Sequence, residues 1–169
     1  MFDIMTSRDF YAKLVADFDD YMSAPDSSRH ALNCAITAFH LYEWVWGDWL
    51  KTDYVVQKAL GIRNQKTFLE WITRASPWFV AVRDLANGTK HFIRDQGFET
   101  MRIGGYGAGA YGVGPYGRAY LLIDFGEDAA EHRWLPAQHL LEVVVRFWRD
   151  FFKKYRPDMD IPVSKHHVD

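Results

Sequence analysis

The sequence predicts a mainly α protein: an up-and-down helical bundle with an antiparallel β-hairpin or three-stranded β-meander inserted before the last helix. Three observations support this fold class. Apolar residues recur at helical spacing through the first half of the chain and again after Pro136. Between these stretches, at about 98–135, the pattern changes to strand-like alternation. Of the 169 residues 49% are hydrophobic, enough for a sizeable core, so we expect a single domain over 1–157 and a polar tail over 158–169.

Two helices are predicted in the N-terminal part of the chain. The first begins after a cap at Thr6 or Ser7 and ends at Ala24-Pro25. Its apolar residues share one side: Phe10, Leu14, Phe18 and Tyr21. The second runs from a cap within 26–28 to about Leu50 and is apolar around most of its circumference. That distribution predicts a central position in the bundle.

A narrow polar stripe on the second helix has two interpretations. It comprises Asn33, Thr37, His40 and either Glu43 or Trp44. In the simpler interpretation it is the solvent face of a packed helix. In the other, His40 and Glu43 turn inward toward polar residues further along the chain, since a pair three residues apart shares one face. A metal site is not expected, because bundles that bind two metal ions use paired Glu-x-x-His motifs and this His-x-x-Glu has no twin.

Three further helices follow the same logic. A short helix over 54–60 stops at Gly61, and Asn64 caps another that ends near Ala75. The last helix opens at Pro136 and has a wide apolar face, and Pro157 stops it. Its opposite side is basic: Arg146, Arg149, Lys153 and Arg156.

The strand region contains one low-complexity tract. Strands are predicted at 98–103 and 119–125, with a third within 131–135. The tract over 104–117 is rich in glycine and tyrosine and includes G-x-G-x-x-G, but Pro115 and a strand follow it, so the helix that a nucleotide loop needs is absent. Stacking of its tyrosines on single-stranded bases is a second possibility. We expect a mobile connection between antiparallel strands.

The best candidate site lies in 76–92. Ser76 is expected to cap a helix with Pro77 at its first position. The apolar face comprises Trp78, Val82, Leu85, Thr89 and Phe92. The neighbouring stripe comprises Arg83, Asn87 and His91, with Lys90 and Arg94 beside it. Asn87-Gly88 could end this helix, but both stripes continue in phase to Phe92, which favours one continuous helix.

The segment LANGTKHF over 85–92 resembles the signature of HEPN (higher eukaryotes and prokaryotes nucleotide-binding) domains. Those are helical bundles in which an Arg, usually followed by Asn or another polar residue, precedes a His by four to six residues. Asn87 matches the polar position and His91 the His, whereas Ala86 stands at the Arg position and Arg83 lies one turn earlier. Many such domains are metal-independent ribonucleases of toxin–antitoxin and antiphage systems, and others are non-catalytic. The resemblance implies an RNA- or nucleotide-directed homodimer.

The residue types on this helix suit RNA cleavage without a metal or other cofactor. A base must take the 2′-OH proton, a cation must stabilise the developing phosphorane charge, and an acid must protonate the 5′-oxygen. His91 can serve as base or acid, Arg83 or Lys90 can supply the charge, and Asn87 can position a phosphate. Supporting roles are assigned to His40, Glu43 and Arg94. Alternatively, Arg83 is a surface charge, Asn87 a cap and His91 a structural histidine.

Two other functions stay open. One is a non-enzymatic interaction or assembly module that uses aromatic and basic surface: Trp44, Trp46, Trp49, Arg146, Arg149 and Lys153. The other is small-molecule binding in an aromatic-lined pocket near Trp71, Trp78 and His40.

Charge, cysteine content and hydropathy indicate which partners and which cellular compartment to expect. The formal net charge is −2, so a polyanion would need a local basic patch. Cys34 is the single cysteine, which excludes an intrachain disulfide and fits a reducing compartment. The first ten residues lack a signal-peptide layout, and polar residues interrupt the most apolar stretch, 31–49. We therefore expect a cytoplasmic protein with no membrane partner.

Overall fold

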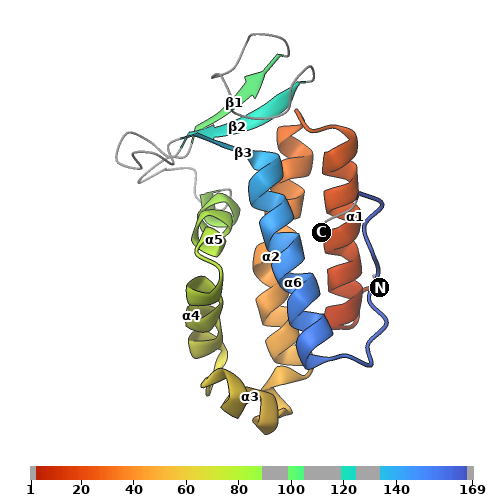
Figure 1. Cartoon of the computed structure of the whole chain (residues 1–169), viewed down its shortest axis with the longest axis vertical. Coiled ribbons are helices and arrows are strands. Elements are labelled where there is room, and N and C mark those ends of the chain that lie inside the picture. The colour runs from red at the N-terminus through yellow and green to blue at the C-terminus, as the bar shows by residue number, and fades with distance from the viewer. Residues whose placement is uncertain (1–2, 89–98, 105–118, 125–133, 167–169) are drawn as a thin grey trace.

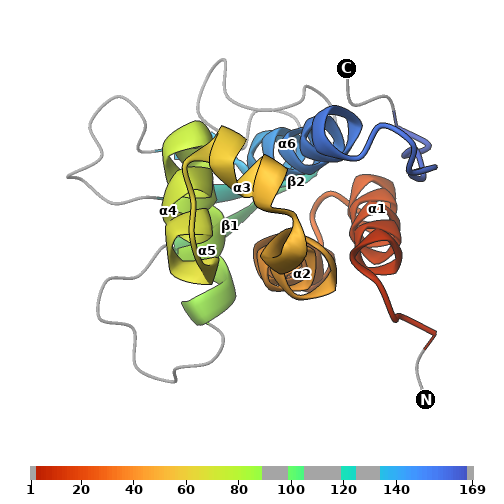
Figure 2. The ribbon, with the colours of Figure 1, turned by 90° about the horizontal axis from the view of Figure 1, so that it is seen from below.

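The computed structural model describes residues 3–88, 99–104, 119–124 and 134–166. Three long helices lie side by side: α1 (Ser7–Ser23), α2 (Ser28–Asp48) and α6 (Ala137–Tyr155). Four shorter elements follow α2 in the chain: η1 (Leu50–Thr52), α3 (Tyr54–Leu60), α4 (Gln65–Ala75) and α5 (Trp78–Gly88). Figures 1 and 2 show α2 and α6 between α1 on one side and the α4–α5 pair on the other. The predicted helical bundle is therefore confirmed.

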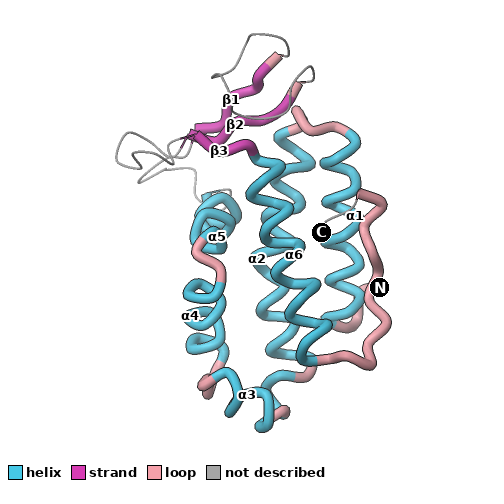
Figure 3. The backbone as a smooth tube through the Cα atoms, viewed as in Figure 1, coloured by secondary structure: helices cyan, strands magenta, loops and turns pink. Residues whose placement is uncertain are grey.

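A small antiparallel sheet precedes α6 and lies at the opposite end of the bundle from α3 (Figure 3). Its strands, in spatial order, are β1 (Glu99–Ile103), β2 (Tyr120–Asp124) and β3 (Trp134–Pro136). Ile103 pairs with Tyr120, and Leu122 pairs with Pro136. The three-stranded form of the predicted insertion is thus correct, and the glycine–tyrosine tract connects two antiparallel strands as expected. Its conformation lies outside the described residues.

The side chains of β2 alternate between two apolar clusters, as the pleat of a strand requires. Leu121 and Ile123 join the main core, whereas Tyr120 and Leu122 pack with Ile103 in a smaller cluster. The backbone N–H of Leu121 also donates to the carbonyl of Pro25, at 3.1 Å, in the turn between α1 and α2. The sheet is therefore fastened to the helices by both packing and hydrogen bonding.

Helix ends follow the local chemistry that the sequence indicated. Thr6 caps α1 in a reciprocal capping box with Asp9, and Asn64 does the same for α4 with Thr67. Ser27 caps α2. Gly61 ends α3 with φ +67°, in the left-handed region that favours glycine.

Aromatic side chains from α1, α2, α4, α5 and α6 fill the core. Trp148 is fully buried, and its indole N–H donates to the Ala38 carbonyl of α2 at 2.9 Å. Phe79 of α5 lies 6.0 Å from both the Trp148 ring and the Phe39 ring, measured between centroids. These contacts join α2, α5 and α6 into one packed unit, which fixes the orientation of α5.

Three sequence expectations need correction. The Ser76 hydroxyl is buried without a hydrogen-bond partner within the described residues, so it does not cap α5; instead the Ser76 carbonyl accepts from the Phe79 N–H at 2.9 Å. Helix α5 begins at Trp78, and its apolar face is wider than predicted: Val82 is buried and Trp78 and Leu85 pack against the core, but Phe79 and Ala86 are buried as well. Thr37, expected on the solvent stripe, is only 2% exposed because its hydroxyl bonds to α1.

The segment after α6 runs back along α1. It was expected to be a polar tail, but part of it packs against the helices. Met159 and Ile161 pack against the core. The Ser164 hydroxyl donates to the Asp19 carboxylate at 2.5 Å, and Arg8 forms an ion pair with Asp160 at 3.6 Å. This segment therefore covers part of α1.

Candidate functional site

Helix α5 carries the first half of the predicted polar row. Its apolar side chains pack against α2 and α6, which turns the residues between them outward. Arg83 and Asn87, one helical turn apart, are both half-buried on this outward side. Asn87 and Gly88 both belong to α5, and the predicted continuation of the helix to Phe92 lies outside the described residues. Beyond Gly88 the description stops, and Lys90, His91 and Arg94 lie outside it.

The Arg83 guanidinium is held by its neighbour. Its Nε lies 2.8 Å from Asp84 Oδ1, and the two side chains are 38% and 37% exposed. At that exposure the ion pair contributes little to stability. It does orient the guanidinium, whose terminal N–H groups can still donate to an anion such as a phosphate.

The predicted His40–Glu43 pair forms on α2. His40 Nδ1 lies 3.0 Å from Glu43 Oε2, and the Tyr42 hydroxyl donates to Glu43 Oε1 at 3.2 Å. Burial, followed by the nearby Glu43 carboxylate, raises the pKa of Tyr42, and Gln65 at the start of α4 also hydrogen-bonds this tyrosine. The pair is therefore tied to the α2–α4 contact, while Arg83 is paired within α5.

The proposed aromatic surface is largely used for packing. Trp49 is only 7% exposed and belongs to the core. Trp44 stacks on Phe10 of α1 with ring centroids 4.7 Å apart, and Trp46 packs against Phe68 of α4. All three indoles therefore pack between helices, although Trp44 and Trp46 are only half-buried.

The basic side of α6 is also partly occupied. Arg149 pairs with Asp150 at 2.9 Å, and the Nε of Arg146 is buried. Lys153 is exposed. Trp71 and Trp78, suggested as pocket walls, instead lie against Phe147 and His139 of α6.

A polar cluster between α1 and α2 was not foreseen as a unit. The Thr37 hydroxyl donates to Asp17 Oδ2 at 2.6 Å and accepts from Lys13 Nζ at 2.7 Å. Lys13 Nζ also pairs with Asp17 at 2.5 Å, and the Asp17 side chain is only 15% exposed. The i,i+4 spacing of the charged pair was readable in the sequence, but its buried partner on α2 was not. Each of the three side chains bonds to the other two, which suits a structural role.

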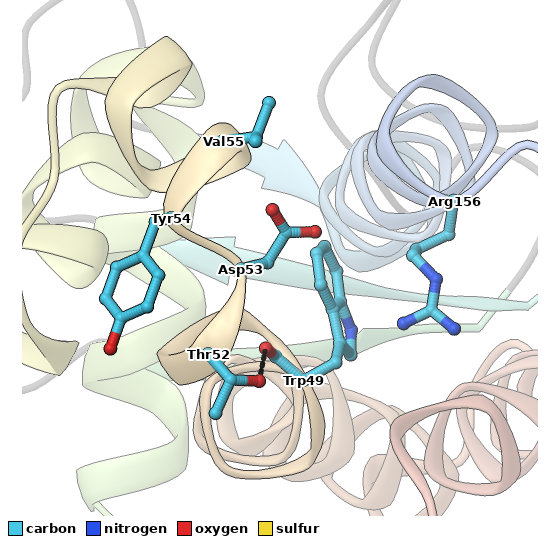
Figure 4. A pocket seen from close by; sticks show the side chains of 6 residues that line it. All are labelled: Trp49, Thr52, Asp53, Tyr54, Val55 and Arg156. Carbon is cyan, nitrogen blue, oxygen red and sulfur yellow. Dashed lines mark hydrogen bonds between the residues drawn. The ribbon is translucent and has the colours of Figure 1, made fainter.

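A shallow, open depression of about 440 Å³, which we call the cavity, lies at the end of the bundle opposite the sheet (Figure 4). The residues that line it come from the α2–η1–α3 connection and from the residue after α6: Trp49, Thr52, Asp53, Tyr54, Val55 and Arg156. The Arg156 guanidinium lies over the Trp49 ring, with its Cζ 5.0 Å from the ring centroid. No sequence signal pointed to this cavity, because its walls meet only when α3 and the end of α6 come together.

Other kinds of site receive no support from the described ranges. There, no three His, Cys, Asp or Glu side chains gather closely enough to hold a metal ion. None of the helices described combines the length and apolarity that crossing a bilayer requires. Comparison with family models, with curated proteins and with solved structures returned no match. Function must therefore be inferred from the residues themselves.

Proposed function

We propose that this chain is a HEPN-like, RNA-directed helical module whose working surface is the outward side of α5. One observation carries the proposal. Arg83 and Asn87 occupy successive turns on that side, and the helix that holds them reaches Gly88, three residues before His91. A guanidinium and a carboxamide presented in this way can hold two oxygens of one phosphate group.

The chemistry assigned to the surface follows from the residue types. His91 acts as general base or acid on the ribose 2′-OH or the leaving 5′-oxygen. Arg83 and Lys90 stabilise the charge that develops on phosphorus, and Asn87 positions the phosphate. Arg94 extends the cationic side. In this proposal His40 and Glu43, hydrogen-bonded to each other, act only indirectly, from the helix α2 against which the apolar side of α5 packs.

A second copy of the chain completes the site in this proposal. Two α5 helices facing each other across a dimer axis would place two His91 side chains in one cleft, so that one could act as base and the other as acid. The module would work in the cytoplasm, in a toxin–antitoxin or antiphage setting. Light scattering of the purified chain tests the dimer directly.

Cleavage of RNA in the presence of EDTA tests the proposal. We expect the wild-type chain to degrade a labelled single-stranded RNA without metal and H91A to be slower by about 10²–10⁴-fold, the usual contribution of a general acid or base. H139A is the matched control, because His139 is exposed on α6, away from the proposed row. Equal rates for H91A and H139A would contradict the assigned chemistry. A wild-type chain that neither cleaves nor binds RNA would contradict the function.

A further inference from the structure

The cavity at the α3 end of the bundle contains two opposite charges that do not pair. Asp53 and Arg156 both line it, yet no ion pair within 4 Å joins them in the described part of the chain. Figure 4 shows the Asp53 carboxylate and the Arg156 guanidinium on either side of the Trp49 indole. Charges that share a cavity without meeting are suited to a ligand that carries both signs.

Each charged group is held by a contact that leaves it able to bind. Asp53 Oδ1 accepts from the Val56 N–H at 3.0 Å, and no bond of its other oxygen is seen in the described ranges. The Arg156 guanidinium lies over the Trp49 ring, with its Cζ 5.0 Å from the ring centroid, and its N–H groups can donate to a carboxylate. Both groups are thereby oriented before any ligand arrives.

Trp49 adds a donor that lacks an acceptor. Its side chain is only 7% exposed, and its indole N–H is buried without a hydrogen-bond partner among the described residues. Buried donors in proteins are nearly always satisfied, and leaving one unmade is unfavourable. In Figure 4 the nitrogen edge of the indole faces the side on which Arg156 lies. A ligand oxygen bound by Arg156 would give this N–H its acceptor.

Two large side chains that line the cavity are exposed to solvent. Tyr54 and Val55 are 76% and 80% exposed, so an apolar ligand group could cover them. The cavity is open to solvent, so a small molecule bound there would stay partly exposed.

We propose that this cavity binds a small zwitterion with an apolar side chain, of the amino-acid class. The ammonium group pairs with Asp53, the carboxylate accepts from Arg156 and the Trp49 N–H, and the side chain covers Val55. This site is separate from α5 and does not depend on the RNA-directed function.

The test is a titration of the ¹⁵N-labelled full-length chain with L-leucine, followed by NMR. W49F identifies the Trp49 indole cross-peak among those of the seven tryptophans. We expect a saturable shift of that peak, with affinity reduced at least about tenfold in R156Q and in D53N, the loss expected for one charge-assisted hydrogen bond. Asparagine can still cap α3, so D53N should fold. The matched controls are R74Q and D20N, at exposed positions away from the cavity, which should bind as the wild type does.

Two analogues separate the ligand's charges. N-acetyl-L-leucine lacks the ammonium group and L-leucinamide lacks the carboxylate, so each should bind at least about tenfold more weakly than leucine. Three results would overturn the proposal: no saturable shift with leucine, wild-type affinity for leucine in R156Q or D53N, or an affinity of the wild type for either analogue equal to that for leucine. The R83A variant should show the same leucine-induced shift of the Trp49 peak as the wild type. Failure of leucine binding and failure of the RNA-directed function can therefore be told apart.

Discussion

Replacing Thr37 with valine tests whether the cluster between α1 and α2 stabilises the fold. Valine has nearly the same shape but no hydroxyl. Thr37 is 2% exposed, and its hydroxyl bridges the Asp17 carboxylate and the Lys13 ammonium. The substitution therefore removes two hydrogen bonds to charged groups without opening a cavity.

The expected loss of stability in T37V depends on how well Lys13 and Asp17 can replace the hydrogen bond that each loses. The Lys13 side chain is 39% exposed and can donate to water instead of Thr37, so losing this hydrogen bond costs little free energy. Asp17 is 15% exposed and loses a donor that water cannot easily replace, at about 1.5–3 kcal/mol for a hydrogen bond to a charged group. The added buried methyl returns about 0.8 kcal/mol. We expect T37V to lower the free energy of unfolding by about 1–2 kcal/mol.

Urea denaturation of T37V and T73V measures this effect against a matched control. The Thr73 hydroxyl donates to the Glu70 carbonyl within its own helix, at 3.0 Å, so its removal should change the free energy of unfolding by less than about 0.5 kcal/mol. A midpoint for T37V equal to that of T73V, or higher than the wild type, would refute the assigned role of the cluster.

Three further outcomes follow from the described residues. Gly47 and Gly61 both face open space, but only Gly61 has a positive φ, of 67°. In denaturation experiments G47A should therefore raise stability by about 0.5–1 kcal/mol and G61A lower it by about 1–2 kcal/mol; a gain for G61A would contradict the left-handed turn. Burial raises the pKa of Tyr11 from 10 to about 12, so stability present below pH 10 should fall by roughly 2–3 kcal/mol as the pH rises to 12. Tyr11→Phe should flatten that decline in urea midpoints, and an unchanged decline would contradict it. Burial also raises the pKa of the Cys34 thiol, so a disulfide reagent should modify it only in denaturant, whereas rapid native labelling would disprove its burial.

Features set by a few adjacent residues could be predicted from the sequence. The caps at Thr6 and Asn64, and the stop at Gly61, depend on hydrogen bonds and backbone angles within one turn. The switch from helical to strand-like periodicity likewise located the sheet before the last helix. The fold class was therefore within reach of local reasoning.

Features that depend on residues far apart in the chain could not be predicted from the sequence. Thr37 is polar and sits on a polar stripe, and only its contact with Asp17 of α1 explains its burial. Trp49 reads equally well as surface or core until Phe151 packs against it. The same holds for the candidate site: spacing placed Arg83 and Asn87 on one side of a helix, whereas the α3 cavity depends on tertiary packing.

The most direct test of the RNA-directed function is to map where RNA touches the chain. A short single-stranded RNA added to the ¹⁵N-labelled protein should shift the backbone peaks of Arg83, Asp84 and Asn87 and the side-chain amide peak of Asn87. The shifts should weaken in R83A but not in R74A, a matched change at an exposed arginine of α4. Absence of shifts on α5, or shifts confined to the cavity around Trp49, would contradict the proposed working surface.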